Sequence, residues 1–375
     1  MVTGKLFPLG KAHGEAFCNR TEETSRLVGY IERGRHSFIL APRRYGKSSL
    51  CEKALEQAKY PWSKIDLHMA VTEKDAERCL VNGISELLAK SVGKATEKLM
   101  LIVKKYAKSL QPKLAIGPKY LRLELTVNEH SSPAENIYDA ILILEKVLKE
   151  NNKRAVLLLD EFQEIGVLKE GRAIEGGIRS AAQETQHLSI IFCGSNPHML
   201  KMMFEDERRP LYKLCRKLIV DRIEAHHYRR HLDHAAKTIW HATLDEPVFL
   251  KIMSLTDRHP YYINYLCDEL CSFCDSVPTE ADVEHAWNVV LEEERSDLIK
   301  DFAGLTANQR KLMIHIANHG GKGMYSGETA AHTGIGISSV SRALESLVEQ
   351  NFVEKIEDTY RLIVPAYRQL LNDEV

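Results

Sequence analysis

The sequence predicts an α/β protein with a doubly wound parallel sheet, followed by a helical region and a winged-helix domain. Three observations lead to this fold class. Short aliphatic runs alternate with helical stretches up to about residue 225, which is the pattern of a parallel sheet covered by helices. The strand pattern then stops, and helical periodicity continues to about residue 300. The last part has the order helix, helix, helix, hairpin, which is typical of a winged helix. We therefore place the domains at residues 1–225, 226–300 and 301–375.

The first region contains five expected strands. Two of them are almost continuously apolar, which indicates strands that are covered on both faces of a parallel sheet. In chain order the expected strands are Ser37–Ala41, Ile65–Ala70, Ala155–Asp160, Leu188–Gly194 and a weaker Lys217–Ile223. The expected helices between and before them are Glu22–Arg33, Ser48–Ala58, Asp75–Val92 and Ser132–Glu150.

The rest of the chain is expected to be mainly helical. Thr306 and Ser338 are positioned as N-caps of two of the helices, because their hydroxyls can accept from free backbone N–H groups. Two alternating apolar runs flank a short turn near the end and predict a hairpin. The expected helices are Tyr261–Phe273, Thr279–Lys300, Leu305–Asn318, Ser326–His332 and Ser338–Gln350, and the expected strands are Phe352–Ile356 and Tyr360–Val364.

Composition excludes several classes of protein. The hydrophobic fraction of 44% and the charged fraction of 27% are ordinary for a globular chain and exclude wholesale disorder. The formal charge of −1 excludes a protein that is basic over its whole surface. No apolar run approaches the length of about 20 residues that a membrane span needs. The first ten residues lack the apolar core of a signal peptide, so the 8 cysteines are expected to be reduced thiols in the cytoplasm.

A phosphate-binding loop is the sharpest local pattern. The segment ending in Gly46, Lys47 and Ser48 follows an expected strand and opens an expected helix, as such a loop requires. Gly46 lets the backbone approach a phosphate, and the helix N-terminus directs free N–H groups at it. Lys47 would reach the β- and γ-phosphates, and Ser48 would place its hydroxyl on Mg²⁺. Ala41 stands where this motif has its first glycine.

Polar residues also follow two of the buried strands. Asp160 and Glu161 end the third strand, at the edge where open α/β sheets bind ligands. Asp160 would hold Mg²⁺ through its water shell, and Glu161 would be the general base that activates water. Ser195 or Asn196, after the fourth strand, is expected to hydrogen-bond the γ-phosphate or the attacking water.

These motifs together resemble the P-loop ATPases of the AAA+ superfamily, and within it the STAND-related archaeal-type ATPases, which also occur in bacteria. The resemblance covers most of residues 15–270. The residues that carry it are Phe17, Asn19, Arg20, Glu22, Pro42-Arg43-Arg44-Tyr45-Gly46-Lys47-Ser48-Ser49, Leu159-Asp160-Glu161-Phe162-Gln163-Glu164, Phe192-Cys193-Gly194-Ser195, Arg209-Pro210-Leu211-Tyr212 and His259-Pro260-Tyr261-Tyr262.

The resemblance implies a sheet with strand order 5-1-4-3-2 and a small helical lid over the nucleotide. It also implies that His259 and Pro260 form the lid motif near the adenine. A glycine commonly precedes that pair in the family, where this chain has Asp257 and Arg258. The expected ATP-binding residues are Pro42, Arg43, Arg44, Tyr45, Gly46, Lys47, Ser48, Ser49, His259 and Pro260, and the expected catalytic residues are Lys47, Glu161, Ser195 and Asn196.

Other polar clusters have ordinary structural interpretations beside functional ones. Arg208 or Arg209 could act as a finger on a neighbouring subunit's nucleotide, or simply face solvent. Cys267, Cys271 and Cys274 share one face of an expected helix and are interpreted as packed thiols rather than cluster ligands. The histidines of 226–234 are interpreted as polar helix residues rather than a zinc site.

Two functions stay open. One is an ATP-hydrolysing switch that couples ATP or ADP to its winged helix and to a protein partner or to self-association. The other is a DNA-associated ATPase that resembles origin-recognition initiators. Residues 90–122 contain nine Lys or Arg and one glutamate, which favours DNA. Residues 301–375 contain seven Lys or Arg and nine acidic residues, which favours the protein partner.

Overall fold

The computed structural model describes residues 6–92, 97–106, 108–116, 121–128 and 130–372. The chain divides into two compact units. The first, which we call the sheet unit, contains Thr21–Arg43 and Leu50–Val220, and the second, the helical unit, contains Met1–Arg20, Arg44–Ser49 and Asp221–Val375. No helix within the described part of the chain has the length and apolar character to cross a membrane.

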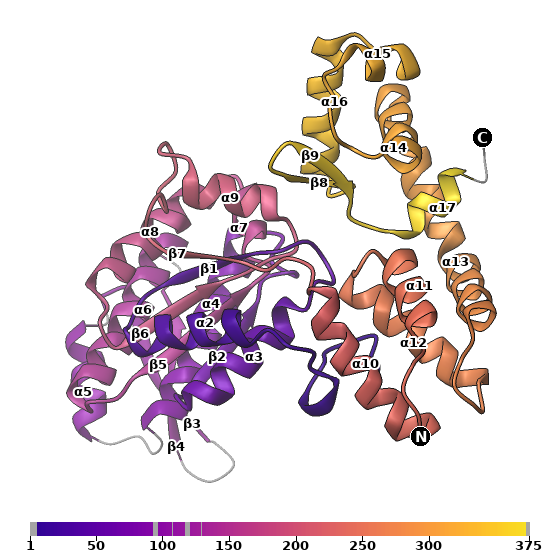
Figure 1. Ribbon diagram of the computed structural model, residues 1–375. Helices are drawn as coiled ribbons and strands as arrows, with labels where there is room; N and C mark the ends of the chain where they lie inside the picture. Colours follow the sequence, from indigo (N-terminus) through magenta and orange to yellow (C-terminus); the bar gives the residue numbers. More distant parts are fainter. Residues whose placement is uncertain (1–5, 93–96, 107, 117–120, 129, 373–375) are drawn as a thin grey trace. The chain divides into compact units, whose positions relative to one another are not determined.

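A five-stranded parallel sheet forms the centre of the sheet unit (Figure 1). Its strands lie in the order β2-β5-β6-β1-β7. When the strands are renumbered without β3 and β4 and read from the β7 edge, this is the predicted order 5-1-4-3-2. The predicted fold class is therefore confirmed. The strands are β1 (Ser37–Leu40), β2 (Trp62–Asp66), β5 (Ala155–Asp160), β6 (Leu188–Phe192) and β7 (Arg216–Ile219).

Helices cover the sheet and build its core. Along one face, α6 packs between α4 and α8, and α4 and α6 also contact the strands. Alternate residues of β5, Ala155, Leu157 and Leu159, belong to this core, while all six residues of the strand are buried. The helices of the unit are α2 (Thr21–Glu32), α3 (Lys47–Ala58, whose first turn belongs to the helical unit), α4 (Glu73–Val92), α5 (Glu97–Tyr106), α6 (Pro133–Glu150), α7 (Gln163–Val167), α8 (Gly171–Glu184) and α9 (Pro197–Glu205).

Three features of the sheet unit differ from the sequence prediction. β7 ends at Ile219, whereas the expected strand continued to Ile223. The second strand begins at Trp62, not at Ile65, and it ends at Asp66. Because β2 lies at the sheet edge, only Ser63 and Ile65 of the strand are buried, and the expected strand Ile65–Ala70 left out the residues before Ile65 and continued past Asp66. An antiparallel hairpin, β3 (Leu110–Ile116) with β4 (Leu121–Val127), is not among the five expected strands; the sequence offers a possible hairpin around residues 117 and 118, which themselves lie outside the described residues.

The helical unit has its own apolar core, in which Tyr228, Tyr262 and Trp287 are fully enclosed. α11, α12 and α13 pack on one another. Thr279 caps α13 through a capping box with Asp282, which explains why the helix starts there. The helices are α10 (Ala225–Trp240), α11 (Glu246–Thr256), α12 (Pro260–Phe273) and α13 (Glu280–Ala303), with a single 3₁₀ turn, η1 (Gly14–Ala16), near the N-terminus.

The C-terminal region has the element order that the winged-helix prediction requires. It contains α14 (Ala307–His319), α15 (Gly327–Thr333), α16 (Ile337–Glu349), the antiparallel strands β8 (Val353–Ile356) and β9 (Thr359–Leu362), and α17 (Ala366–Asn372). Thr306 caps α14 as predicted. The predicted cap at Ser338 is wrong: α16 begins one residue earlier, and its N-cap position is held by Gly336 without a side-chain bond.

Candidate functional site

The predicted strand, loop and helix of the phosphate loop are present. β1 ends at Leu40 and α3 begins at Lys47, so residues 41–46 form the connecting loop. Gly46 has φ +82°, a left-handed conformation that side chains with a Cβ rarely adopt, and the space around it is open. Lys47 and Pro42 are buried, whereas Arg43 is exposed. Ser48 is half-buried, and the hydroxyl of Ser49 accepts a hydrogen bond from the Ala12 N–H at 2.9 Å.

Tyr45 anchors this loop inside the helical unit. Its side chain is fully buried, and its hydroxyl donates to the Glu354 carboxylate on β8 at 2.8 Å. The same hydroxyl accepts from Nε of Arg222 at 2.9 Å. Arg20 donates to the Tyr45 carbonyl at 3.3 Å. The loop is therefore linked by one tyrosine to the C-terminal hairpin and to a buried arginine.

Arg222 uses every nitrogen of its guanidinium. Nε bonds Tyr45, while Nη1 lies 2.5 Å from the Asp257 carboxylate and also donates to the Asp257 carbonyl. Nη2 donates to the carbonyls of Leu362 and Ile363 at 2.8 and 3.1 Å. Because a charge that is 1% exposed is stable only when it is paired and hydrogen-bonded, this network fixes the position of the arginine. Arg222 was not predicted as a site residue, because it lies within the weakest expected strand, Lys217–Ile223, and belongs to no motif.

Arg44 is held by α12 and α13 of the same unit. Its guanidinium carbon lies 4.0 Å from the centre of the Tyr261 ring, and Nη1 lies 3.3 Å from the Glu294 carboxylate on α13. Glu294 also accepts from the hydroxyl of Tyr262. Arg44 has φ +65°. Two consecutive loop residues, Arg44 and Tyr45, are thus held by side chains from α12, α13 and β8.

Asp160 lies at the carboxyl end of β5 in the sheet unit and is almost fully buried. One of its oxygens lies 2.6 Å from Nζ of Lys64, and the other accepts from the Cys193 thiol at 3.1 Å. Burial raises the pKa of Asp160, but the hydrogen bonds from Lys64 and Cys193 outweigh it and leave the pKa below its usual range. The carboxylate is therefore ionised at neutral pH. Such an oxygen donor fits Mg²⁺, which binds carboxylates through part of its water shell.

Glu161, which follows β5, is in contact with Ser195, which follows the neighbouring strand β6. Its Oε2 accepts from the Ser195 hydroxyl at 2.7 Å, from the Ser195 N–H at 3.0 Å and from the Gln163 amide at 2.6 Å. Glu161 also has φ +52°. Asn196 uses its side-chain oxygen to cap α9 by accepting from the Met199 N–H at 3.0 Å. Ser195 thus contacts Glu161, and the Asn196 side chain caps α9.

His259, which was expected in a lid motif, is buried beside the loop tyrosine. His259 is 1% exposed, and its ring meets Tyr45 edge-on with centroids 4.9 Å apart. Burial, with the charges of Arg222 and Arg44, holds the pKa of His259 well below its usual range, so the ring is neutral. Pro260 is the first residue of α12. The preceding Asp257 and Arg258 have φ +46° and +58°, which accounts for the glycine that the resembling family has near this position.

The two candidate arginine fingers differ in their surroundings. Arg209 forms an ion pair with Glu175, whose side chain is fully buried. Arg208 is 82% exposed and pairs with Asp206 at 2.9 Å. Of the two, only Arg208 faces solvent.

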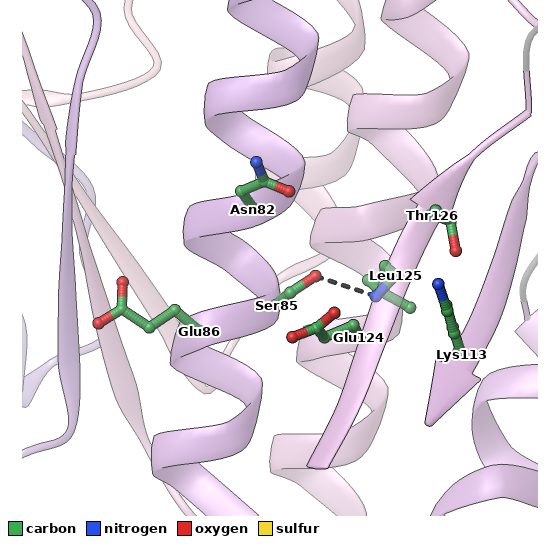
Figure 2. A pocket seen from close by; sticks show the side chains of 7 residues that line it. All are labelled: Asn82, Ser85, Glu86, Lys113, Glu124, Leu125 and Thr126. Carbon is green, nitrogen blue, oxygen red and sulfur yellow. Dashed lines mark hydrogen bonds between the residues drawn. The ribbon is translucent and has the colours of Figure 1, made fainter. Parts of the chain in front are cut away.

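A surface pocket of about 480 Å³ lies between α4 and the β3–β4 hairpin (Figure 2). Ser85 on α4 accepts from the Leu125 N–H of the hairpin at 3.1 Å. The lining carries the carboxylates of Glu86 and Glu124 but only one cation, Lys113. This charge balance does not fit a triphosphate, so the pocket is not assigned to nucleotide binding.

Taken together, the loop between β1 and α3, the acidic pair after β5 and the strand order define an AAA+-like P-loop ATPase fold. Residues 17–266 match a family described as an ATPase domain predominantly from Archaea. The chain belongs to this family, which confirms the resemblance predicted from the motifs. No curated protein matches the chain.

Solved structures share the fold over nearly the whole chain. A Walker-type ATPase of Pyrococcus abyssi is 18% identical, with 98% of this chain and 99% of that chain covered and a TM-score of 0.70. The ORC2 protein of Aeropyrum pernix, in ADPNP–ADP complexes, is 12% identical, with 95% and 94% covered and a TM-score of 0.54. The ORC1 protein of Aeropyrum pernix in complex with DNA is 15% identical, with 99% and 96% covered and a TM-score of 0.50.

Proposed function

We propose that this protein is an Mg²⁺-dependent ATPase of the STAND type, in which the nucleotide state controls a C-terminal winged-helix domain and through it a protein partner. The observation that carries the proposal is the bond from Tyr45 of the phosphate loop to Glu354 of the C-terminal hairpin. We propose the same domain boundaries as expected from the sequence, at residues 1–225, 226–300 and 301–375. We expect slow ATP turnover, because the nucleotide-bound state of a switch must persist long enough to be sensed.

In this proposal ATP and ADP bind to residues 42–49, and His259 and Pro260 lie near the adenine of the nucleotide. The buried Nδ1 of His259 has no hydrogen-bond partner among the described residues, so a ligand group could satisfy it. Ser48 and Asp160 would hold Mg²⁺, which supplies charge stabilisation for phosphoryl transfer. Lys64 is the cation that Asp160 has in the structure, so the lysine would share or yield this carboxylate when Mg²⁺ is bound.

Glu161 would accept the proton of the attacking water. Three donors converge on its Oε2 in the structure. This oxygen is therefore occupied by protein donors, and the observed arrangement corresponds to a resting base. Ser195, which supplies two of the three donors, is placed to release or hold Glu161 when a γ-phosphate is present.

The loop and the C-terminal hairpin would communicate through the chain of bonds around Tyr45. The Glu354 carboxylate accepts hydrogen bonds from the Tyr45 hydroxyl and, at 2.8 Å, from Arg361. It also lies 3.3 Å from the Arg222 guanidinium. A change in the loop backbone at residues 44–46 moves the tyrosine, and the hairpin then loses or gains a bond to a buried hydroxyl. A two-state element that one ligand can bias is what a switch requires.

We expect Glu354→Ala to weaken this link and to raise ATP turnover about tenfold. A hydrogen bond to a charged group contributes about 1.5–3 kcal/mol, and 1.4 kcal/mol changes an equilibrium tenfold. Turnover and the rate of ADP release are measured on the purified full chain. Tyr45→Phe should also raise turnover. The double variant should add little to either single variant, because both changes remove the same Tyr45–Glu354 hydrogen bond.

Asp358→Ala is the matched control, since it removes an exposed carboxylate from the turn of the same hairpin. It should leave turnover unchanged. If Glu354→Ala behaves like Asp358→Ala, the hairpin does not restrain the loop and the switch proposal loses its main support.

We further propose a cytoplasmic protein that acts with a protein partner or by self-association. All 8 cysteines are free thiols, which agrees with a reducing compartment. The exposed Arg208 could serve a neighbouring copy.

A DNA-associated ATPase is the second candidate, favoured by the fold likeness to the DNA-bound ORC1 protein and by the basic residues 90–122. Lys104, Lys105, Lys108 and Lys113 of this segment are exposed. ATP turnover with and without duplex DNA, at two salt concentrations, separates the two functions. Phosphate contacts would make any stimulation fall steeply with salt, whereas turnover indifferent to DNA supports the protein-directed switch.

A further inference from the structure

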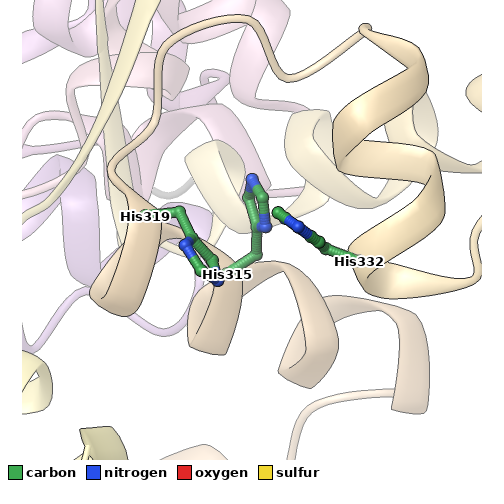
Figure 3. Close-up of side chains that lie close together, drawn as sticks. All are labelled: His315, His319 and His332. Atoms are coloured by element: carbon green, nitrogen blue, oxygen red, sulfur yellow. The ribbon is translucent and has the colours of Figure 1, made fainter.

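Three histidines of the C-terminal region lie together, although the sequence had singled out a different histidine cluster. His315 and His319 are one turn apart on α14, and His332 lies on α15 (Figure 3). One ring nitrogen from each of the three lies within 4.8 Å of the other two. This is the one group of metal-ligand side chains found among the described residues, so the histidines of 226–234 and the cysteines of α12 form no such group there.

The hydrogen bonds of His315 determine which of its nitrogens is available. Thr329 has one hydroxyl proton and donates it to the Gly323 carbonyl at 3.2 Å. Nε2 of His315 lies 3.4 Å from the same hydroxyl oxygen, so the tautomer that completes this hydrogen bond is the one with the proton on Nε2. Nδ1 then holds a lone pair. It is buried and has no hydrogen-bond partner among the described residues.

A buried lone pair without a donor is unfavourable unless something binds it. Metal-binding histidines commonly have this arrangement, in which the second ring nitrogen donates to a protein oxygen and fixes the ring. His315 is 7% exposed, whereas His319 and His332 are exposed and have freedom to turn toward it. The one buried ligand is therefore preformed, and the two adjustable ligands face solvent, through which an ion can enter.

A negative charge near the cluster also favours a cation. Glu328 lies one turn before His332 on α15, and its carboxylate acts electrostatically on His315.

We propose that His315, His319 and His332 bind one Zn²⁺ ion, with a water molecule as the fourth ligand. Three imidazoles and an open position suit tetrahedral Zn²⁺, and Zn–N bonds of about 2.0–2.1 Å place ligand nitrogens roughly 3.3 Å apart. The two exposed rings, of His319 and His332, stack with centroids 4.6 Å apart. They would turn so that the three ligand nitrogens, now within 4.8 Å of one another, approach this spacing. The ion would join α14 to α15 and stabilise the C-terminal region. This inference does not depend on the proposed function.

The test is a Zn²⁺ titration of the metal-free full chain by calorimetry, with Co²⁺ as a spectroscopic probe. We expect one Zn²⁺ per chain, visible absorption of tetrahedral Co²⁺ and a raised melting temperature with Zn²⁺. His319→Gln and His332→Gln should each weaken binding at least about 100-fold, since loss of an outer-shell partner alone costs 10–100-fold. Both residues are exposed, so these variants should fold.

His68→Gln, at an exposed histidine of the sheet unit, is the matched control and should bind like the wild type. Thr329→Val removes the acceptor that orients His315 and should weaken Zn²⁺ binding about tenfold. No binding to the wild type would overturn the proposal. So would equal binding to the double variant His319→Gln/His332→Gln, which would assign the ion to other ligands such as the free thiols.

Discussion

Replacement of Lys47 by alanine is expected to abolish detectable ATP binding. Lys47 is the first residue of α3 and is buried at the end of the phosphate loop, where free backbone N–H groups gather. Its ammonium would supply charge-assisted hydrogen bonds to the phosphates, each worth about 1.5–3 kcal/mol. Loss of two such bonds lowers affinity by at least about 100-fold, which calorimetry with ATP would measure.

Lys53→Ala is the control for this experiment, because it removes a lysine from the middle of the same helix. The control should bind ATP like the wild type. Normal ATP affinity in Lys47→Ala would contradict the assignment of residues 42–49 to the phosphates. Loss of affinity in both variants would indicate a general effect on α3 instead.

The sheet could be predicted from sequence because each strand carries its own signal. β5 matches its predicted bounds at both ends, since a run of buried aliphatic residues stops abruptly at Asp160. The edge strand β2 was misplaced by three residues at its start, because an edge strand needs apolar residues on one side only. The strand order came from the family resemblance, and no local pattern could supply it.

The network around Tyr45 could not be predicted, because its partners are far apart in the chain. Arg222 and Glu354 are 177 and 309 residues away from Tyr45. Nothing in the residues next to Glu354 distinguishes it from the other carboxylates of the hairpin. The motif identified Tyr45 as a loop residue, but only the fold shows that its hydroxyl is buried against these two charges.

The histidine cluster shows the same limit in another form. The spacing of His315 and His319 places both on one face of α14, and this much is visible in the sequence. The third ligand depends on how α15 packs against α14, and the free nitrogen depends on the hydrogen bonds of Thr329. By contrast, the histidines of 226–234 were more conspicuous because they are dense in sequence. Density along the chain is a poor guide to distance in space.

Glu161→Gln is expected to preserve ATP binding and to reduce ATP turnover by about 10²–10⁴-fold, the usual contribution of a general base. The amide keeps an oxygen that can accept from the Ser195 hydroxyl and N–H, so the local geometry should survive. The amide cannot take a proton from water, and that is the only function removed.

Glu164→Gln is the matched control, because Glu164 also accepts from Gln163, at 3.1 Å, and should be dispensable. Single-turnover hydrolysis and ATP affinity are measured for both variants. Normal hydrolysis in Glu161→Gln would exclude Glu161 as the base, whereas lost binding would mean that this carboxylate maintains the loop after β5 rather than the chemistry.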